Sequence, residues 1–179
     1  MLLLRIYQKW LNKHFLVVQS VQTGALMAAG DAIAQLAIEK KKLPEFDLSR
    51  TAKFGFLGTC FVGPTLTVWY RLLAKQFGTS SSTSTALKKM ACDQLIFAPT
   101  FLSIFIANVN FLSGKSVQDI KQELSRTYLD ILIVNWKVWP AVQLVNFYCV
   151  PLNYQVLLVQ GVALFWNTYL SWKTQKKVD

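Results

Sequence analysis

The chain has 179 residues, a length typical of one domain, but 53% of them are hydrophobic and the mean hydropathy is +0.33, which is too apolar for a soluble domain. Nineteen Lys and Arg against nine Asp and Glu give a net charge of +10. Most of the basic residues lie in short segments between long apolar runs, and this placement favours a membrane protein over a nucleic-acid-binding protein.

The first segment, residues 1–14, predicts an amphipathic basic helix. Arg5, Lys9 and Lys13 are spaced by four and share one helical face, while apolar residues such as Trp10 occupy the other. No acidic residue appears before Asp31. The segment is therefore similar to a mitochondrial targeting sequence and also to a helix lying in the membrane interface, two interpretations that are compatible.

Five apolar segments follow, each near the roughly 20 residues that cross a bilayer core. They span about 15–38, 51–70, 91–112, 132–150 and 152–172. Only the region of Pro151 separates the last two, which could be a tight hairpin, or one span with a helix packed beside it. We predict an all-α fold and a single domain over residues 1–179. It would be a polytopic membrane bundle of four to five helices with amphipathic interfacial helices.

The connections between these segments are short and polar. Before the fourth span, Ser116 and Asp119 form a capping box. The residues that follow predict an amphipathic helix on the membrane surface that leads into the span. Basic residues are divided almost evenly between the two sides of a four-span bundle, so the sequence leaves the orientation open.

Small side chains recur every four residues in the first two spans. The first span has Ser20, Gly24, Ala28 and Ala32, and the second has Gly55, Thr59, Gly63 and Thr67. Small residues at this spacing let helix backbones approach closely, so we interpret both ridges as packing surfaces. Pro64, Pro99 and Pro140 lie inside spans and are expected to bend them.

Polar residues within the spans are the candidate functional residues, because ionisable groups are costly in a bilayer. The candidates for a polar interior or pore are Asp31, Gln35, Asp93, Lys137, Gln143, Asn146, Gln160 and Asn167. They could line a hydrated path or, alternatively, form buried pairs, reach the interface by snorkelling, or link helices by amide hydrogen bonds. We expect Asp93 and Asp31 to face one hydrated cavity.

Signals for enzymatic chemistry are missing. No nucleophile is matched with a base and an orienting acid, and there is no glycine-rich phosphate loop. Cys60, Cys92 and Cys149 lie singly in apolar runs, and with one histidine, His14, they predict neither a disulfide framework nor a metal site. We expect no catalytic residues and no cofactor.

The stretch from Asn135 onward reads NWKVWPAVQLVNFYCVPLNYQVLLVQGVALFWNTYLSWK. It resembles the signature of the Mpv / peroxisomal-membrane-protein-of-twenty-two-kilodaltons family, and the similarity extends upstream to Gly30–Asp31, Phe61–Tyr70 and Ala86–Pro99. The signature positions in this chain are Trp139, Pro140, Asn146, Phe147, Pro151, Trp166 and Asn167. The sequence departs from the pattern at Gln155, where many members have an arginine.

The resemblance is greatest to the family's mitochondrial inner-membrane member. It implies a small helical organelle membrane protein that forms channels and supports mitochondrial DNA maintenance. The expected partners are the lipid bilayer and small solutes or metabolites, with no direct nucleic-acid contact, and a homo-oligomer is left open. The alternatives are a peroxisomal membrane channel, for which Lys40–Lys42 could be a targeting signal, and a non-conducting membrane scaffold.

Overall fold

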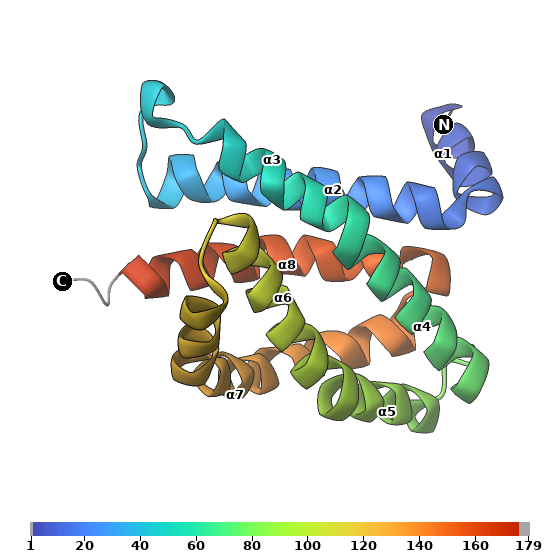
Figure 1. The fold of residues 1–179 in the computed structure, drawn as a ribbon. Helices are drawn as coiled ribbons and strands as arrows, with labels where there is room; N and C mark the ends of the chain where they lie inside the picture. The colour runs from blue at the N-terminus through green and yellow to red at the C-terminus, as the bar shows by residue number, and fades with distance from the viewer. Residues whose placement is uncertain (1, 176–179) are drawn as a thin grey trace. The chain divides into compact units, whose positions relative to one another are not determined.

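The computed structural model describes the backbone of residues 2–175 and the side chains of residues 6–166, and within this part the chain is helical without strands. The α-helices are α1 (Leu2–Lys13), α2 (Phe15–Ile33), α3 (Leu48–Leu57), α4 (Gly63–Phe77), α5 (Thr83–Cys92), α6 (Ala98–Leu112), α7 (Val117–Cys149) and α8 (Leu152–Gln175) (Figure 1). The predicted all-α fold is therefore confirmed for the described residues.

Three π-helical turns join some of these segments into longer helices. They are η1 (Ala34–Ile38) after α2, η3 (Gly58–Val62) between α3 and α4, and η4 (Asp93–Phe97) between α5 and α6, while a short 3-10 turn, η2 (Leu43–Glu45), lies in the loop before α3. The described chain therefore forms six continuous helices. The run formed by α2 and η1 covers 15–38, the same residues as the first predicted span.

Two of the π turns lie directly before a proline. The Gly63 N–H bonds to the Gly58 carbonyl five residues back, one residue before Pro64, and the Ala98 N–H bonds to the Asp93 carbonyl in the same way before Pro99. Proline has no N–H to donate and its ring crowds the carbonyl four residues back. The wider π turn relieves that crowding, so both helices continue through their prolines. Pro140 lies within uninterrupted α7.

The helices form two compact units. The first consists of residues up to Arg71 together with those from Asn153 onward, and the second of Leu72–Leu152. Each unit is described by itself below. The prediction of one domain over residues 1–179 stays a prediction.

In the first unit, α2 packs against α3 and η3 on one side and α8 on another. Gln19 Nε2 donates to the Asn153 carbonyl at 2.7 Å. Eleven residues further along both helices, a Cβ built on Gly30 would lie 3.8 Å from Leu164 Cγ. Because both contacts have the same offset in sequence, α2 and α8 run parallel, as Figure 1 shows.

Glycines bring the backbones of α2 and its antiparallel neighbour into direct contact. A Cβ built on Gly58 would lie 2.7 Å from Gly24 Cα, and one built on Gly63 would lie 2.6 Å from Ser20 Cα. A Cβ on Gly24 would overlap Thr59 Oγ1 and lie 2.7 Å from the Gly55 carbonyl oxygen. The two predicted ridges of small residues therefore face each other, and the packing interpretation is confirmed.

In the second unit, α5 and α6 pack along α7 in the opposite direction. Tyr128 Oη donates to the Pro99 carbonyl at 3.0 Å, and Asn135 Nδ2 donates to Gln94 Oε1 at 3.1 Å. Helix α7 begins at the predicted capping box, in which Ser116 Oγ accepts from the Asp119 N–H. The expected surface helix and the fourth span thus form one helix of 33 residues.

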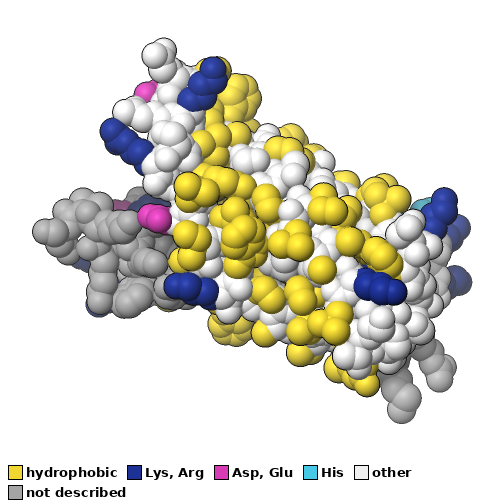
Figure 2. All heavy atoms as spheres, turned by 90° about the horizontal axis from the view of Figure 1, so that it is seen from below, with side chains coloured by type: hydrophobic (Ala, Val, Ile, Leu, Met, Phe, Trp, Pro, Cys, Tyr) yellow, Lys and Arg dark blue, Asp and Glu magenta, His cyan; other side chains and the backbone are white. Residues whose placement is uncertain are grey.

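Within the described part of the chain, one helix, Thr83–Leu112, is both long and apolar enough to cross a membrane. The apolar helix Leu152–Trp166 is shorter. Many large hydrophobic side chains are nevertheless exposed, including Val17, Leu95, Ile96 and Phe165. Figure 2 shows hydrophobic side chains, drawn in yellow, exposed over much of the visible surface. Exposed apolar surface of this kind is expected where helices contact lipid. The number of spans, four or five, stays a prediction.

Candidate functional site: an ion-pair network and two buried polar clusters

The first polar site lies where α2 turns back into α3. Helix α2 continues into η1, and the chain then reverses through a loop in which Lys40 has a positive φ of 50°. Asp47 begins α3 as its N-cap, because its side chain accepts from the Arg50 N–H at 2.8 Å. This reversal brings Arg50, in the first turn of α3, beside Asp31, near the end of α2.

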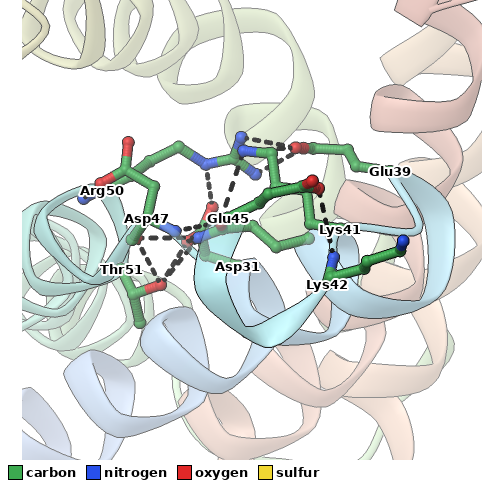
Figure 3. A network of polar contacts seen from close by, with 9 residues as sticks. Asp31, Glu39, Lys41, Lys42, Glu45, Asp47, Arg50 and Thr51 are labelled. Carbon is green, nitrogen blue, oxygen red and sulfur yellow. Dashed lines mark hydrogen bonds and ion pairs between the residues drawn. The ribbon is translucent and has the colours of Figure 1, made fainter.

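Arg50 binds two carboxylates at once. Its Nε donates to Asp31 Oδ1 at 2.6 Å, and its Nη2 and Nη1 donate to Glu39 Oε1 and Oε2 at 2.6 and 3.1 Å (Figure 3). The planar guanidinium matches the two oxygens of Glu39, a geometry that an ammonium group lacks. The Asp31 side chain is only 4% exposed and the Arg50 side chain is 32% exposed. The burial of Asp31 is therefore compensated by a charged partner.

Neutral groups complete the shell around Asp31. The Thr51 hydroxyl and Gln35 Nε2 both donate to Asp31 Oδ2, at 2.7 and 2.9 Å. Gln35 also bridges to the loop, since its Oε1 accepts from the Asp47 N–H at 2.8 Å. Lys41 adds a second cation, 3.0 Å from Glu39 Oε2. Two acids and two bases thus balance in a network that joins the end of α2 to the start of α3.

The network shifts the ionisation of its outer members. Burial alone would raise the pKa of Glu39, but hydrogen bonds from Arg50 and Lys41, together with their positive charges, outweigh it and hold that pKa below its ordinary value of 4.5. Burial also acts on Arg50, where it would lower the pKa. The hydrogen bonds and negative charges of Glu39 and Asp31 outweigh burial, and the pKa of Arg50 is raised. Both residues are held in their charged forms at neutral pH.

The second site is a group of buried polar side chains along α2 and α4. Gln19 and Thr23 are fully buried and Thr67 is 1% exposed. The atoms Gln19 Oε1, Thr23 Oγ1 and Thr67 Oγ1 have no hydrogen-bond partner. Two contacts between α2 and α4 flank these residues, one between Phe15 and Arg71 and one between Thr23 and Gly63. Gln19 lies midway between Phe15 and Thr23, and Thr67 lies midway between Gly63 and Arg71. Gln19 and Thr67 therefore face each other across the helix interface.

The third site is in the second unit, between η4 and α7. Asp93 is 2% exposed and accepts from Gln94 Nε2 at 2.8 Å, and Gln94 Oε1 in turn accepts from Asn135. Further along α7, Asn146 Nδ2 donates to Gln143 Oε1 at 3.1 Å, while Asn146 Oδ1 is buried without a partner. The amide side chains of α7, Asn135, Gln143 and Asn146, are thus buried.

Lys89 is an additional buried cation in this unit. It is 3% exposed, and its Nζ lies 6.0 Å from the centre of the Phe147 ring. Lys89 lies just before the third predicted span, 91–112, and therefore outside it. In the structure α5 starts at Thr83, so this lysine lies within the long apolar helix.

The remaining candidates are placed as follows. Gln160 is buried in α8, Lys137 is exposed on the surface of α7, and the side chain of Asn167 lies outside the described residues. The exposure of Lys137 fits the snorkelling interpretation better than a place in the interior. Asp31 and Asp93 belong to different units, so the expectation that they face one cavity stays a prediction.

The signature residues of the C-terminal stretch serve the packing of both units. Asn146 and Phe147 are buried in α7, which also contains Trp139 and Pro140, and Trp166 is buried in α8. Pro151 lies in the two-residue connection between those helices. Gln155, at the departure from the family pattern, is buried near the start of α8.

Residues that could bind a metal ion do not cluster: no group of three or more His, Cys, Asp or Glu side chains suited to a metal is found among those described. The three cysteines are free. The three polar sites can hold charge, water or neighbouring helices, and these are the properties of the interior of a helical membrane protein.

The model of the Mpv17 / PMP22 family matches residues 110–171. The chain is 46% identical to the human mitochondrial inner membrane protein Mpv17, across 98% of this chain and 99% of the relative. It is 44% identical to the Xenopus laevis protein of the same name, across 96% and 97%, and 40% identical to Protein sym-1 of Neurospora crassa, across 93% and 95%. No solved structure matches the chain.

The helices, their exposed apolar surface and these relatives define a helical protein of an organelle membrane. The chain belongs to the Mpv17 / PMP22 family. Nearly full-length identity of about 45% to relatives named for the mitochondrial inner membrane confirms the predicted location there. The peroxisomal alternative receives no support.

Proposed function

We propose that this protein forms a channel-like path for small solutes across the mitochondrial inner membrane. Through the balance of those solutes in the matrix it would contribute to mitochondrial DNA maintenance, with no direct contact to nucleic acid and no catalytic activity. Partner-free buried polar atoms are the observation that supports this proposal. Gln19 Oε1, Thr23 Oγ1 and Thr67 Oγ1 gather at one interface, and Asn146 Oδ1 lies in the second unit.

The argument rests on the cost of an unsatisfied buried group, roughly 1–3 kcal/mol each. Dry helix packing would leave these atoms without partners in surroundings that offer no water. Water molecules satisfy buried polar groups in most proteins, and a line of polar atoms along one helix interface suits several waters in sequence. We therefore propose a hydrated interior, which is the requirement for conduction.

A non-conducting scaffold is the second candidate. The contact of Gly58 with Gly24, and of Gly63 with Ser20, makes the first unit tightly packed along α2. The network around Arg50 also fixes the α2–α3 reversal. A protein that serves only to hold partners or to organise the membrane would have the same two features.

Planar bilayers separate the two candidates. The purified full chain is incorporated under a KCl gradient, and we expect stepwise conductance with a reversal potential that reports ion selectivity. A preparation denatured by heat is the control for detergent and contaminants. If protein that is folded by circular dichroism gives no conductance over the control, the scaffold candidate replaces the channel.

The Thr67→Val variant tests the supporting observation itself. Valine has the shape of threonine without the hydroxyl, so a dry, unsatisfied site should become more stable and a hydrated site should conduct less. The matched control is Thr100→Val, where the hydroxyl is exposed and already donates to the Ile96 carbonyl at 3.0 Å. A more stable Thr67→Val protein with unaltered conductance would contradict the hydrated interior.

A further inference from the structure

Helix α1 presents a basic surface that is anchored to the rest of its unit. Tyr7 Oη donates to Gln22 Oε1 in α2 at 2.8 Å, and Gln8 Nε2 donates to Tyr154 Oη in α8 at 3.4 Å. Leu11 is 1% exposed and packs beneath the helix. The position of α1 is therefore set by contacts to two other helices, and its outward side chains form a defined surface.

Those outward side chains combine cations with large apolar groups. Lys9 and Lys13 are exposed, as are Trp10 at 59% and Ile6 at 45%. The rings of Trp10 and His14 lie 5.7 Å apart. Figure 2 shows dark blue basic side chains beside the chain's single histidine, drawn in cyan. Tryptophan beside lysine is the combination found where a helix meets the headgroup region of a bilayer.

Arg71 of the first unit adds a third cation to this surface. Its guanidinium carbon lies 4.1 Å from the centre of the Phe15 ring, two residues after Lys13. The guanidinium group therefore lies over the ring, while the Arg71 side chain remains exposed. Among the described residues no carboxylate pairs with Arg71, Lys9 or Lys13.

The acids of the first unit lie at the opposite end of α2. Among the described residues of this unit they are Asp31, Glu39, Glu45 and Asp47, all at or beyond the C-terminal end of that helix. From Phe15 to Asp31 the helix rises about 24 Å at 1.5 Å per residue. This exceeds the Debye length of about 8 Å at physiological salt, so the acids do not neutralise the α1 surface.

We propose that Lys9, Lys13 and Arg71 bind the phosphate headgroup of an anionic phospholipid, while Trp10 and Ile6 contact its acyl chains. An unpaired group of three cations is complementary to phosphate, and Arg71 offers two parallel donors to its oxygens. The exposed apolar side chains beside the cations select a lipid over free phosphate, because only a lipid supplies a hydrocarbon surface next to the charge. This site goes beyond the proposed conduction and does not depend on it.

Native mass spectrometry of the purified full chain tests the site. The protein in non-ionic detergent is titrated with phosphatidylglycerol, with phosphatidylcholine, or with inorganic phosphate, and retained ligands are counted by mass. We expect phosphatidylglycerol to be retained in preference to phosphatidylcholine, retention to fall as salt is raised, and inorganic phosphate not to displace the lipid. Displacement by millimolar phosphate would identify a simple anion site and overturn the lipid assignment.

Matched charge variants locate the site. Lys9→Gln, Lys13→Gln and Arg71→Gln together should weaken phosphatidylglycerol binding by about two orders of magnitude, at roughly fivefold per basic residue. The control is Lys40→Gln, Lys42→Gln and Lys53→Gln, which removes three exposed cations from the other end and should leave binding within about twofold of the parent. Equal losses in both variants would show that net charge alone governs binding and would overturn the site.

A single substitution tests the site independently, in case the triple variant misfolds. Arg71→Gln leaves α1 unchanged, and a roughly fivefold loss is expected from it alone. Thermal melting of each variant verifies that the helices are intact. Unchanged affinity in folded Arg71→Gln, measured beside the parent, would remove Arg71 from the site and contradict the proposal.

Discussion

Gly63 in α4 lies directly against the backbone of Ser20 in α2, so close that a built Cβ would be 2.6 Å from Ser20 Cα. No real Cβ tolerates that separation, and the neighbour is backbone that cannot rotate away. We therefore expect Gly63→Ala to push the two helices apart and to lower the free energy of unfolding by about 1–3 kcal/mol. Gly63→Leu, with its larger side chain, should lower the free energy of unfolding further. Thermal melting in detergent measures both.

Gly161→Ala in α8 is the matched control, since nothing lies within 4 Å of its built Cβ. Alanine has the better helix propensity, so this variant should melt at or slightly above the parent temperature. If the Gly63→Ala protein melted like the parent while the control behaved as expected, the close contact between α2 and α4 would be refuted.

The fork between Arg50 and Glu39 predicts that Arg50→Lys is not a conservative change. Lysine keeps the charge but cannot donate to Asp31 and to both oxygens of Glu39 together. The variant should lose about 1.5–3 kcal/mol of unfolding free energy, the usual range for hydrogen bonds to charged groups. Arg126→Lys, at an exposed position of α7, is the control and should be neutral. If the two variants melted at the same temperature, the positive charge at position 50, and not the geometry of its hydrogen bonds, would account for the stability that the network contributes.

Glu39 also predicts a pH dependence. Its pKa is lower in the folded protein than its ordinary value of 4.5, so its ionised form stabilises the fold above that pH. The stabilisation is lost as pH falls from 4.5 through the lower folded pKa. Glu39→Gln should therefore be less stable than the parent at pH 7, and the difference should shrink below pH 4.5. Denaturant titrations at several pH values give the difference, which would stay constant if Glu39 were unpaired.

Local signals in the sequence predicted much of this fold, whereas contacts between helices were harder to foresee. The end of the first helical run at Ile38, the Ser116 cap and the facing small-residue ridges all follow from local propensity and spacing. The partner of Asp31 was missed, because Arg50 lies 19 residues further along and in another helix. A usable signal was present: Asp47 three residues before Arg50 is a helix cap, which places Arg50 in a first turn.

The basic face of α1 predicts a role in import. Changing Arg5, Lys9 and Lys13 to Glu reverses its charge and leaves its apolar face intact, so accumulation in mitochondria should fall strongly. Imaging of the tagged protein in cells, with Lys40, Lys42 and Lys53 changed to Glu as the control, measures the effect. Normal mitochondrial accumulation of the α1 variant would show that internal segments direct the protein.

Asp93 supplies the test of ion selectivity. If it borders a hydrated interior, its charge attracts cations, and Asp93→Asn should lower the cation-to-anion permeability ratio in a bilayer recording. Asp130→Asn, at an exposed position of α7, is the matched control and should leave the ratio unchanged. If the parent and both variants had equal permeability ratios, Asp93 would have only a structural role, and the scaffold candidate would be strengthened.

The candidate polar residues were predicted as residue types more reliably than as a connected site. Polar side chains in apolar helices are recognisable in sequence, and Asp31, Gln35, Asp93, Gln143, Asn146 and Gln160 are indeed buried. Lys137 was a candidate for the interior and is exposed. A shift of one position along a helix changes the direction of a side chain by about 100°, so a small error in helix phase exchanges interior and surface positions. Which buried groups pair depends on helix registers, and a register is set by packing that local sequence does not encode.

The π turn η3 changes the phase of the helix it interrupts. In a regular α-helix, residues four apart drift by about 40°, so Gly55 and Thr67, three such steps apart, would differ by about 120°. One extra residue taken up in the turn makes the interval equivalent to 11 residues, and the drift falls to about 20°. Gly55, Thr59, Gly63 and Thr67 therefore stay in line along α2. If the same residues were wound as a regular α-helix, everything beyond η3 would rotate by about 100°, whereas deleting one residue from η3 would allow regular winding with the ridge still in line. The π winding thus accommodates one extra residue without turning the ridge away from α2.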